Sequence, residues 1–289
     1  MRVAITLALW LLAATSCLAN EIDQLRSREA VTAFLRKHHR YWQNQVFFGP
    51  NAADTVGYGR NKFFQLDLDG NGLTDLLVDG KSLLAVTDAG HGQYHFHFID
   101  RGTNGGSRHT QLLRVRYQGT MPLLAVKSVS THYNNSTNQY STEVRTDNLI
   151  FKYGGFIEYQ AVPANLKIAR ISFSASTCYG SCPVFKLTIG PDRTATYQAI
   201  RYNNKQGQFR GVIDLNAYDQ LLATLAYLHL TSLQDAYAVT WTDDQTMQLE
   251  VTFTNGQVKR IKDYGGVGTQ GLANLYNQLF ALRETQAWK

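Results

Sequence analysis

The chain has 289 residues, of which 44% are hydrophobic and 17% are charged, a composition that excludes an intrinsically disordered protein. Its net charge of +6 comes from basic residues that are scattered instead of gathered into a run with aromatic residues between them, which weighs against nucleic-acid binding. The length suffices for two domains, each with a buried core of its own.

Residues 1–19 have the order of a secretory signal peptide. Arg2 gives the positive start, an apolar run extends from Val3 to Ala14, and small side chains precede Asn20. The run is too short to cross a bilayer, which takes about 20 apolar residues, and no later segment approaches that length. We therefore expect an exported mature chain, periplasmic or extracellular, without a transmembrane segment.

The segment Ala14-Thr15-Ser16-Cys17 permits a second interpretation of this end of the chain. It resembles a weak bacterial lipoprotein box, in which the cysteine is lipidated and becomes the first residue. Cys17 would then carry a lipid anchor and make the protein an outer-membrane lipoprotein. The sequence leaves lipidation and simple signal cleavage open.

Residues 20–162 are predicted to form a helix followed by an antiparallel β-rich module. Apolar residues recur at helical spacing from Asn20 to Gln43, and Asn20 with Asp23 makes a capped start. A loop with several glycines is expected from Phe48 to Asn61, and a long polar loop from Ser130 to Thr142. The predicted strands contain the segments FFQL, DLLV, SLLAV, QYHFHFI, LLRVRY, LLAVKSV and NLIFKY.

Residues 163–289 are predicted to form a separate α+β domain in the order strands, helix, hairpin, helix. Helical spacing of leucines predicts helices at Leu215–Leu230 and at about Gln270–Glu284, and the pair Asn255-Gly256 predicts a hairpin turn. The predicted strands contain IARISFSAS, PVFKLTI, TATYQAIRY, QFRGVID, MQLEVTF and QVKRIKDY. The fold class predicted for the whole chain is therefore α+β.

The loop DLDGNGLTD, residues 67–75, places oxygen-bearing side chains at alternate positions around Gly72, a spacing typical of loops that bind calcium. The glycine allows a sharp bend, and Asp79 is a further candidate ligand. The same residues are also compatible with a plain hydrophilic turn. The predicted calcium ligands are the side chains of Asp67, Asp69, Asn71 and Asp75 and the backbone carbonyl of Leu73.

The segment FFQLDLDGNGLTDLLV around this loop resembles the calcium hairpins of the FG-GAP and VCBS repeat families. In those families a loop of the pattern D-x-D-x-N/D-G-x-x-D joins two strands of a propeller blade, so the resemblance implies a structural calcium ion at a β-hairpin. The families repeat the motif several times, whereas it occurs once in this chain. A complete propeller is therefore not expected.

Cys178 and Cys182 are the cysteines that remain after signal removal, and in an oxidising compartment an even pair favours a disulfide. A disulfide needs α-carbons about 4.4–6.8 Å apart, so the segment CYGSC has to turn. A redox-active pair and a metal site are the alternatives. The spacer is one residue longer than in thioredoxin-like sites, which disfavours the redox interpretation.

The second half of the chain, from about Leu166 to Lys289, resembles a family of bacterial exported domains of unknown function that opens with C-x-G-x-C-P before a strand. The matching residues are Cys178, Gly180, Cys182 and Pro183, followed downstream by Thr242-Asp243 and Asp263-Tyr264-Gly265. The resemblance implies no activity, because none is attached to that family.

His95 and His97 lie on the same face of a predicted strand, where two imidazoles can hold one metal ion. A further ligand would have to come from a loop, with His91 and His109 as candidates. The alternative is that both histidines belong to a polar face that points outward.

Two functions remain open from the sequence. The first is a non-enzymatic binding or structural protein of the bacterial envelope with a calcium-stabilised loop, which holds an envelope protein or polymer. The second is a hydrolase of an envelope polymer that uses carboxylates such as Asp243 and Asp263. Acids at strand ends commonly serve turn formation and solubility, so we favour the first.

Overall fold

The computed structural model describes residues 20–40, 43–45, 47–48, 62–99, 107–134, 139–239 and 241–289. The predicted signal peptide, the lipidation candidate Cys17 and all but the first residue of the predicted loop at 48–61 lie outside these residues. The first half contains a 3-10 helix at Ile22–Gln24, α1 (Arg28–His38), β1 (Lys62–Leu66), β2 (Asp75–Asp79), β3 (Leu83–Asp88), β4 (Tyr94–Phe98), β5 (Ser107–Gln118), β6 (Met121–Asn134), β7 (Gln139–Lys152) and β8 (Gly155–Glu158). The second half contains β9 (Ile168–Ala175), β10 (Val184–Ile189), β11 (Thr194–Arg201), β12 (Gly207–Val212), α2 (Leu215–Tyr227), a 3-10 helix at Leu230–Ser232, β13 (Ala236–Ala238), β14 (Thr246–Phe253), β15 (Val258–Tyr264) and α3 (Gln270–Thr285).

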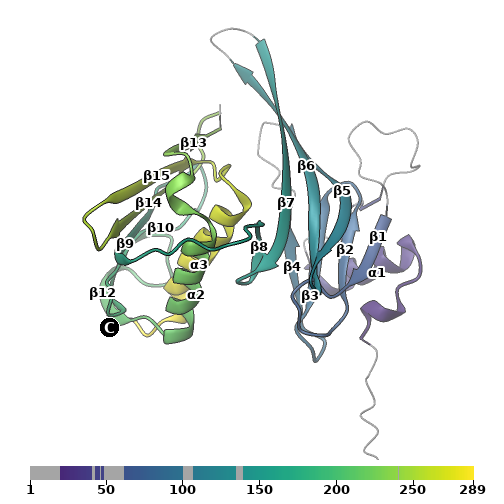
Figure 1. Ribbon diagram of the computed structural model, residues 1–289, viewed down its shortest axis with the longest axis horizontal. Helices are drawn as coiled ribbons and strands as arrows, with labels where there is room; N and C mark the ends of the chain where they lie inside the picture. The colour runs from purple at the N-terminus through teal and green to yellow at the C-terminus, as the bar shows by residue number, and fades with distance from the viewer. Residues whose placement is uncertain are drawn as a thin grey trace, which may run out of the picture.

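The elements stack in successive layers, which confirms the predicted α+β class (Figure 1). α1 covers one face of the four-stranded antiparallel sheet β1-β2-β3-β4, and the other face of this sheet packs on a second four-stranded antiparallel sheet, β5-β6-β7-β8. α2 and α3 lie between that second sheet and a seven-stranded mixed sheet of order β12-β11-β10-β9-β14-β15-β13. Among the described strands of the mixed sheet, β13 runs parallel to its neighbour β15.

The strands β2 and β3 are buried along their whole length because another layer covers each of their faces. Leu76 and Val78 pack on the α1 side, whereas Leu77 between them points toward the second sheet. In β3, Leu84 faces the helix side and Ala85 faces the second sheet. Since alternate residues of a strand point to opposite faces, burial on both faces explains the uninterrupted apolar runs at residues 76–78 and 83–86 within these strands.

The hairpin of β7 and β8 contributes to two hydrophobic cores. Leu149 and Phe156 face the core between the two four-stranded sheets. Ile150 and Ile157 point the other way and join the large core formed by α2, α3 and the inner face of the seven-stranded sheet. This hairpin therefore connects the first half of the chain to the second through side-chain packing.

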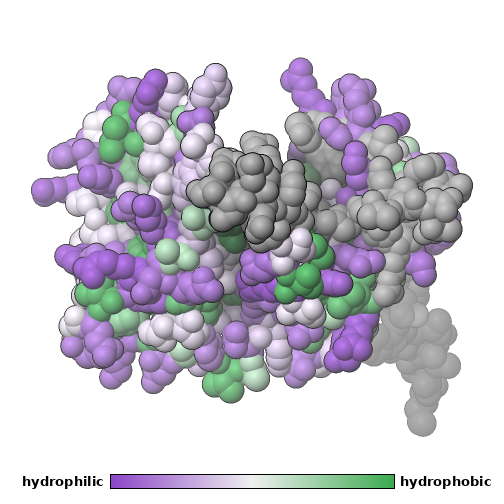
Figure 2. Space-filling model, turned by 90° about the horizontal axis from the view of Figure 1, so that it is seen from above, coloured by the Kyte–Doolittle hydropathy of each residue, from purple (hydrophilic) through white to green (hydrophobic). Residues whose placement is uncertain are grey.

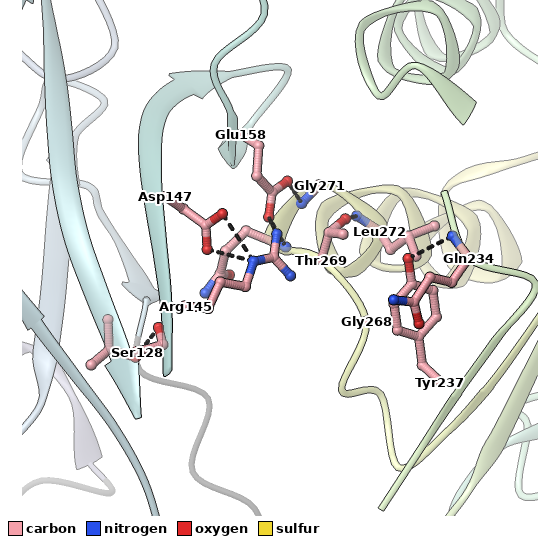
Figure 3. A network of polar contacts seen from close by, with 12 residues as sticks. Ser128, Arg145, Asp147, Glu158, Gln234, Tyr237, Gly268, Thr269, Gly271 and Leu272 are labelled. Carbon is pink, nitrogen blue, oxygen red and sulfur yellow. Dashed lines mark hydrogen bonds and ion pairs between the residues drawn. The ribbon is translucent and has the colours of Figure 1, made fainter. Parts of the chain in front are cut away.

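The carboxylate of Glu158, at the end of β8, binds the N-terminus of α3 (Figure 3). It accepts hydrogen bonds from the backbone N–H groups of Gln270 (2.6 Å) and Gly271 (3.0 Å), and Arg145 donates to the same carboxylate at 3.4 Å. Arg145 also forms an ion pair with Asp147 at 2.8 Å. Because a helix N-terminus carries unpaired N–H groups and a partial positive charge, Glu158 both caps α3 and ties it to β8.

None of the described helices is both long and apolar enough to cross a bilayer. Seen from above, hydrophilic residues dominate and hydrophobic residues form separate patches (Figure 2). The exposed large apolar side chains include Tyr117, Val144, Tyr179 and Val212, which come from different elements. Scattered exposed residues of this kind are normal for a folded protein.

The first helix is shorter than the prediction of Asn20 to Gln43, which was wrong at both ends. Its N-cap is Ser27, whose side chain accepts a hydrogen bond from the Ala30 N–H. The predicted bonds between Asn20 and Asp23 do form, in both directions, but they close the preceding 3-10 turn instead of the helix. Leu25 is extended, so the chain changes direction between the two helical segments.

The prediction of a long polar loop from Ser130 to Thr142 was also wrong. The strands β6 and β7 continue through this tract and remain paired as far as Asn134 opposite Gln139. Threonine and tyrosine have high strand propensity, and a two-stranded ribbon satisfies the backbone N–H and C=O groups without a hydrophobic face. The polar composition therefore did not indicate an absence of strands.

Candidate metal site

The loop of residues 67–75 connects β1 to β2, as the hairpin prediction required. The two strands pair antiparallel up to Leu66 opposite Asp75, so the loop begins and ends at one point of the sheet. Gly70 and Gly72 have φ angles of +79° and +83°. Glycine adopts this left-handed conformation without steric cost, and the chain reverses within a few residues for that reason.

Three carboxylates of this loop converge on one point. Asp67, Asp69 and Asp75 each place a carboxylate oxygen such that these oxygens lie within 4.8 Å of one another. Calcium binds oxygen ligands at about 2.3–2.6 Å, so two ligands of the same ion stand up to about 5 Å apart. The spacing of the three carboxylates therefore fits a divalent cation between them.

Asp75 is completely buried, and it is the residue that fixes the loop to the sheet. Its carboxylate accepts hydrogen bonds from the backbone N–H of Leu68 at 2.7 Å and from that of Asp88 at 2.8 Å. The pKa of Asp75 is raised to about 7, mainly by burial and to a smaller extent by the negative charge of Asp69, against the lowering effect of the N–H donors of Asp88 and Leu68. Without a cation, the ionised form of this acid is costly.

The other two acids are partly exposed and organise the turn. Asp67 accepts hydrogen bonds from the backbone N–H groups of Gly70 (2.7 Å) and Gly72 (2.9 Å), and Asp69 accepts one from that of Asn71 (3.1 Å). The pKa of Asp69 is raised, mainly by burial and also by the nearby charges of Asp67 and Asp88. Each acid thus has a fixed orientation.

Asn71 connects the loop to the end of β3 through hydrogen bonds of its side chain. Its side-chain amide donates to the backbone carbonyl of Asp88 at 2.7 Å and to the Asp69 carboxylate at 3.3 Å. Its side-chain oxygen accepts the Leu73 N–H at 2.7 Å. Ligation of an ion by Asn71 or by the Leu73 carbonyl stays a prediction.

Asp88 was not singled out from the sequence, although it belongs to the surroundings of the site. Asp88 is buried. Its backbone N–H donates a hydrogen bond to the Asp75 carboxylate, and its backbone carbonyl accepts one from the Asn71 side-chain amide. The sequence does indicate a turn at this position, because Asp88 lies two residues before Gly90. The Gly90 N–H donates a hydrogen bond to the Asp88 carboxylate. The sequence alone did not indicate that this turn lies next to the loop of residues 67–75.

The suggestion that Asp79 assists as a ligand was wrong. Asp79 is the last residue of β2 and pairs with Lys62 and Leu83, whereas Asp75 is the first residue of that strand. Four residues of strand separate the two by about 13 Å. A side chain cannot bridge that distance to the carboxylate cluster.

The predicted disulfide between Cys178 and Cys182 forms, with α-carbons 5.8 Å apart. Gln245 holds both ends of the turn, since its side-chain amide donates to the carbonyls of Ser176 and Pro183, each at 2.8 Å. Tyr179 at the tip of the turn is 92% exposed. The bridge therefore shapes a local corner at the start of β10.

The two acids of the hydrolase alternative lie in different environments. Asp263 is completely buried and accepts hydrogen bonds from the backbone N–H groups of Val267 (2.9 Å) and Gly268 (3.1 Å), so it holds the turn that leads into α3. Asp243 is exposed in the segment next to the disulfide corner, where its carbonyl accepts the Tyr179 N–H. Asp263 thus has a structural role, which is independent of any catalysis.

The outward polar face predicted for His95 and His97 was wrong for His97. His95 is exposed, but His97 faces the second sheet, with its ring 4.9 Å from that of Phe151 and 6.4 Å from that of Phe156. Its Nε2 is 3.0 Å from the Thr87 hydroxyl. The two histidines do share one face of β4, as predicted, but a second layer covers the inner part of that face.

Burial lowers the pKa of His97 from 6.5 to about 4, with a smaller contribution from His95. The unfolded chain therefore binds this proton more readily than the folded protein, and stability present above pH 6.5 is lost as the pH falls toward 4. We expect the free energy of unfolding of the wild type to fall by on the order of 3 kcal/mol more than that of His97→Gln over this range. Urea unfolding at several pH values measures the difference, and the exposed His95→Gln is the matched control, which should follow the wild type.

Comparison with known protein families gives a match in the second half of the chain. Residues 169–283 match the family described as Domain of unknown function (DUF6438). The matched range contains the disulfide corner, β9 to β15 and α2, and nearly all of α3. No curated protein matches the chain, and no solved structure does.

This match agrees with the predicted likeness of the second half to a domain family of unknown function. The family description names no activity, so the match implies no chemistry. The likeness of residues 67–75 to FG-GAP and VCBS hairpins stays a prediction. Residues 169–283 of this chain are accordingly a DUF6438 domain of unknown function, preceded by a helix and two four-stranded sheets that carry the carboxylate cluster.

Proposed function

We propose that the protein is an exported, non-enzymatic binding or structural protein of the bacterial envelope, in which a calcium ion stabilises the loop of residues 67–75. The observation that carries the proposal is the convergence of the Asp67, Asp69 and Asp75 carboxylates within 4.8 Å. Two carboxylates 4 Å apart repel by about 1 kcal/mol in water and about 4 kcal/mol near a protein surface. A bound cation converts this repulsion into attraction.

Calcium suits the site better than magnesium or a transition metal. The predicted donors are carboxylate, amide and carbonyl oxygens, which hard cations prefer, and calcium takes six to eight such oxygens in a variable geometry. Magnesium demands a stricter octahedron, and zinc or copper sites use histidine or cysteine ligands. The predicted ligand set is that of the sequence, with Asn71 and the Leu73 carbonyl beside the three acids.

The position of the loop indicates what calcium binding would do. Asp75 joins the loop to β3 through Asp88, and Gly70 lies beside Met121, since a Cβ added there would stand 3.0 Å from the Met121 sulfur. Met121 is the first residue of β6 and packs against the large core of the second half. An ion in the loop would therefore order the contact between the two four-stranded sheets, a structural effect.

Thermal unfolding with calcium and with chelator tests the proposal. An ion that binds only the folded protein raises the stability by about 2.7 kcal/mol at a concentration of one hundred times its dissociation constant. We expect a higher Tm with calcium for the wild type and no change for Asp69→Ala. Asp219→Ala, which removes an exposed acid of α2, is the matched control and should respond as the wild type does. Equal Tm values for the wild type in both buffers would refute calcium binding.

A further inference from the structure

We propose that the uncovered face of the seven-stranded sheet binds an acidic polysaccharide. The inference rests on the proposed envelope role, because it names the surface and the class of polymer that such a protein would hold. α2 and α3 pack on one face of this sheet, on the side of β8 (Figure 1). The other face is not covered by any described element.

Two rows of polar side chains cross the uncovered face, aligned by the pairing of the strands. On every strand these residues alternate with residues that point into the core. The first row runs from β12 to β15 through Gln208, Gln198, Lys186, Ser174, Gln248 and Lys262. The second row runs through Arg210, Thr196, Thr188, Ser172, Glu250 and Arg260.

The uncharged members of these rows suit a polymer of sugars. Serine and threonine hydroxyls and glutamine amides each provide both a donor and an acceptor. Sugar hydroxyl groups do the same, so a carbohydrate chain can exchange hydrogen bonds with both rows. Neither row contains an aromatic side chain, whereas proteins that hold single-stranded nucleic acids stack the bases on aromatic rings.

The charged members favour an acidic polymer. Glu250 is the acid of the two rows, and two arginines already neutralise it, Arg260 at 2.8 Å and Arg170 at 3.5 Å. Lys186 and Lys262 are exposed, and no acid among the described residues forms an ion pair with either. The face therefore carries an excess of positive charge, to which carboxylates of a polysaccharide are complementary.

The face is hollowed along the rows. A groove of about 760 Å³ runs over β9, β10, β14 and β15, with Lys186, Lys262 and Arg260 in its lining. A second groove of about 520 Å³ continues over β10, β11 and β12 and shares Lys186 with the first. Because neighbouring strands lie about 4.8 Å apart, Lys186 and Lys262 stand about 14 Å apart across the intervening β9 and β14. That span suits an extended chain better than a small anion.

Titration with polygalacturonate in calcium-free buffer tests the proposal, with neutral dextran as the uncharged probe. We expect the wild type to bind polygalacturonate, more weakly as salt is added, and not to bind dextran. Lys186→Gln with Lys262→Gln should weaken binding about tenfold or more, because both unpaired cations are lost. Lys186→Arg with Lys262→Arg keeps the charges and should bind like the wild type, which shows that the positions tolerate substitution.

The matched control is Lys62→Gln with Lys81→Gln, which removes the same charge from exposed lysines of the first half. Binding by this control should equal that of the wild type. A control that loses as much affinity as Lys186→Gln with Lys262→Gln would overturn the proposal in favour of a net-charge effect. Failure of the wild type to bind polygalacturonate, or equal binding of an oligothymidylate, would also overturn it.

The same titration with Asp69→Ala separates this proposal from the proposed calcium site. Asp69 belongs to the first half of the chain, and Lys186 and Lys262 belong to the DUF6438 domain. Polymer binding should persist in Asp69→Ala even though its calcium response is lost. Loss of polymer binding in this variant would mean that the loop, and not the sheet face, holds the polymer.

Discussion

Replacing Asp75 with alanine is expected to destabilise the protein by about 2–5 kcal/mol even without calcium, because each buried donor left without an acceptor costs about 1–3 kcal/mol. The two donors are the backbone N–H groups of Leu68 and Asp88, and each donates to one of the two oxygens of this completely buried carboxylate. Both hydrogen bonds are buried, so each donor loses an acceptor inside the protein. Urea unfolding in the presence of chelator measures the effect.

Asp69→Ala is the matched control for this prediction, since it removes a carboxylate of the same cluster from a partly exposed position. It removes the acceptor of the Asn71 backbone N–H and of the Asn71 side-chain amide, and water can solvate both of these exposed groups. We expect a loss within about 1 kcal/mol, typical of an exposed turn hydrogen bond. Both variants should lose the calcium response. Equal unfolding midpoints of the two variants in chelator would contradict a structural role for Asp75.

The contrast between these acids explains how far the sequence predicted the site. The spacing of Asp67, Asp69 and Asp75 was sufficient to place their carboxylates together, because residues of one tight loop stay close whatever surrounds them. The difference between a buried anchor and two partly exposed acids depends on β3, whose Asp88 lies 13 residues after Asp75 and outside the loop. Local spacing therefore predicted the cluster, whereas the roles within it required the tertiary structure.

The same distinction holds for the fold. α3 and the turn at Asn255-Gly256 were predicted correctly, because leucine spacing and a glycine with positive φ are local properties. The short strands β8 and β13 were not predicted, since they contain few residues, and β13 in addition gains its partner from the later strand β15. The prediction that His97 belongs to an outward polar face was wrong. Alternation along β4 indicates which residues share a face of the strand, but not which layer covers that face.

The sequence predicts a domain boundary between residues 162 and 163. Gly271 lies where the two parts of the chain on either side of this boundary are in contact. This glycine is the second residue of α3 and is buried. A Cβ added there would stand 2.2 Å from Cδ2 of Leu228 and 2.7 Å from Cγ1 of Ile157. Real Cβ atoms do not approach other atoms so closely, so α3 can lie against β8 only because this position has no side chain.

Gly271→Ala is therefore expected to destabilise the protein by about 1–3 kcal/mol, the usual cost of overpacking a core. Helix propensity alone predicts the opposite sign, because alanine is more favourable than glycine inside a helix by about 1 kcal/mol. Asn277→Ala, at an exposed position of the same helix, shows the propensity effect without a clash and should be neutral or slightly stabilising. Urea unfolding midpoints of the two variants measure the difference.

A double-mutant cycle with Leu228→Ala distinguishes the clash from a general intolerance of substitution in α3. Leu228 supplies the closest atom, so its truncation provides room for the new methyl group. The cost of Gly271→Ala should then be smaller in the Leu228→Ala background than in the wild type, since the two side chains occupy the same space. An equal cost in both backgrounds would show that α3 does not press on Leu228, and that the contact with Ile157 of β8 accounts for the cost.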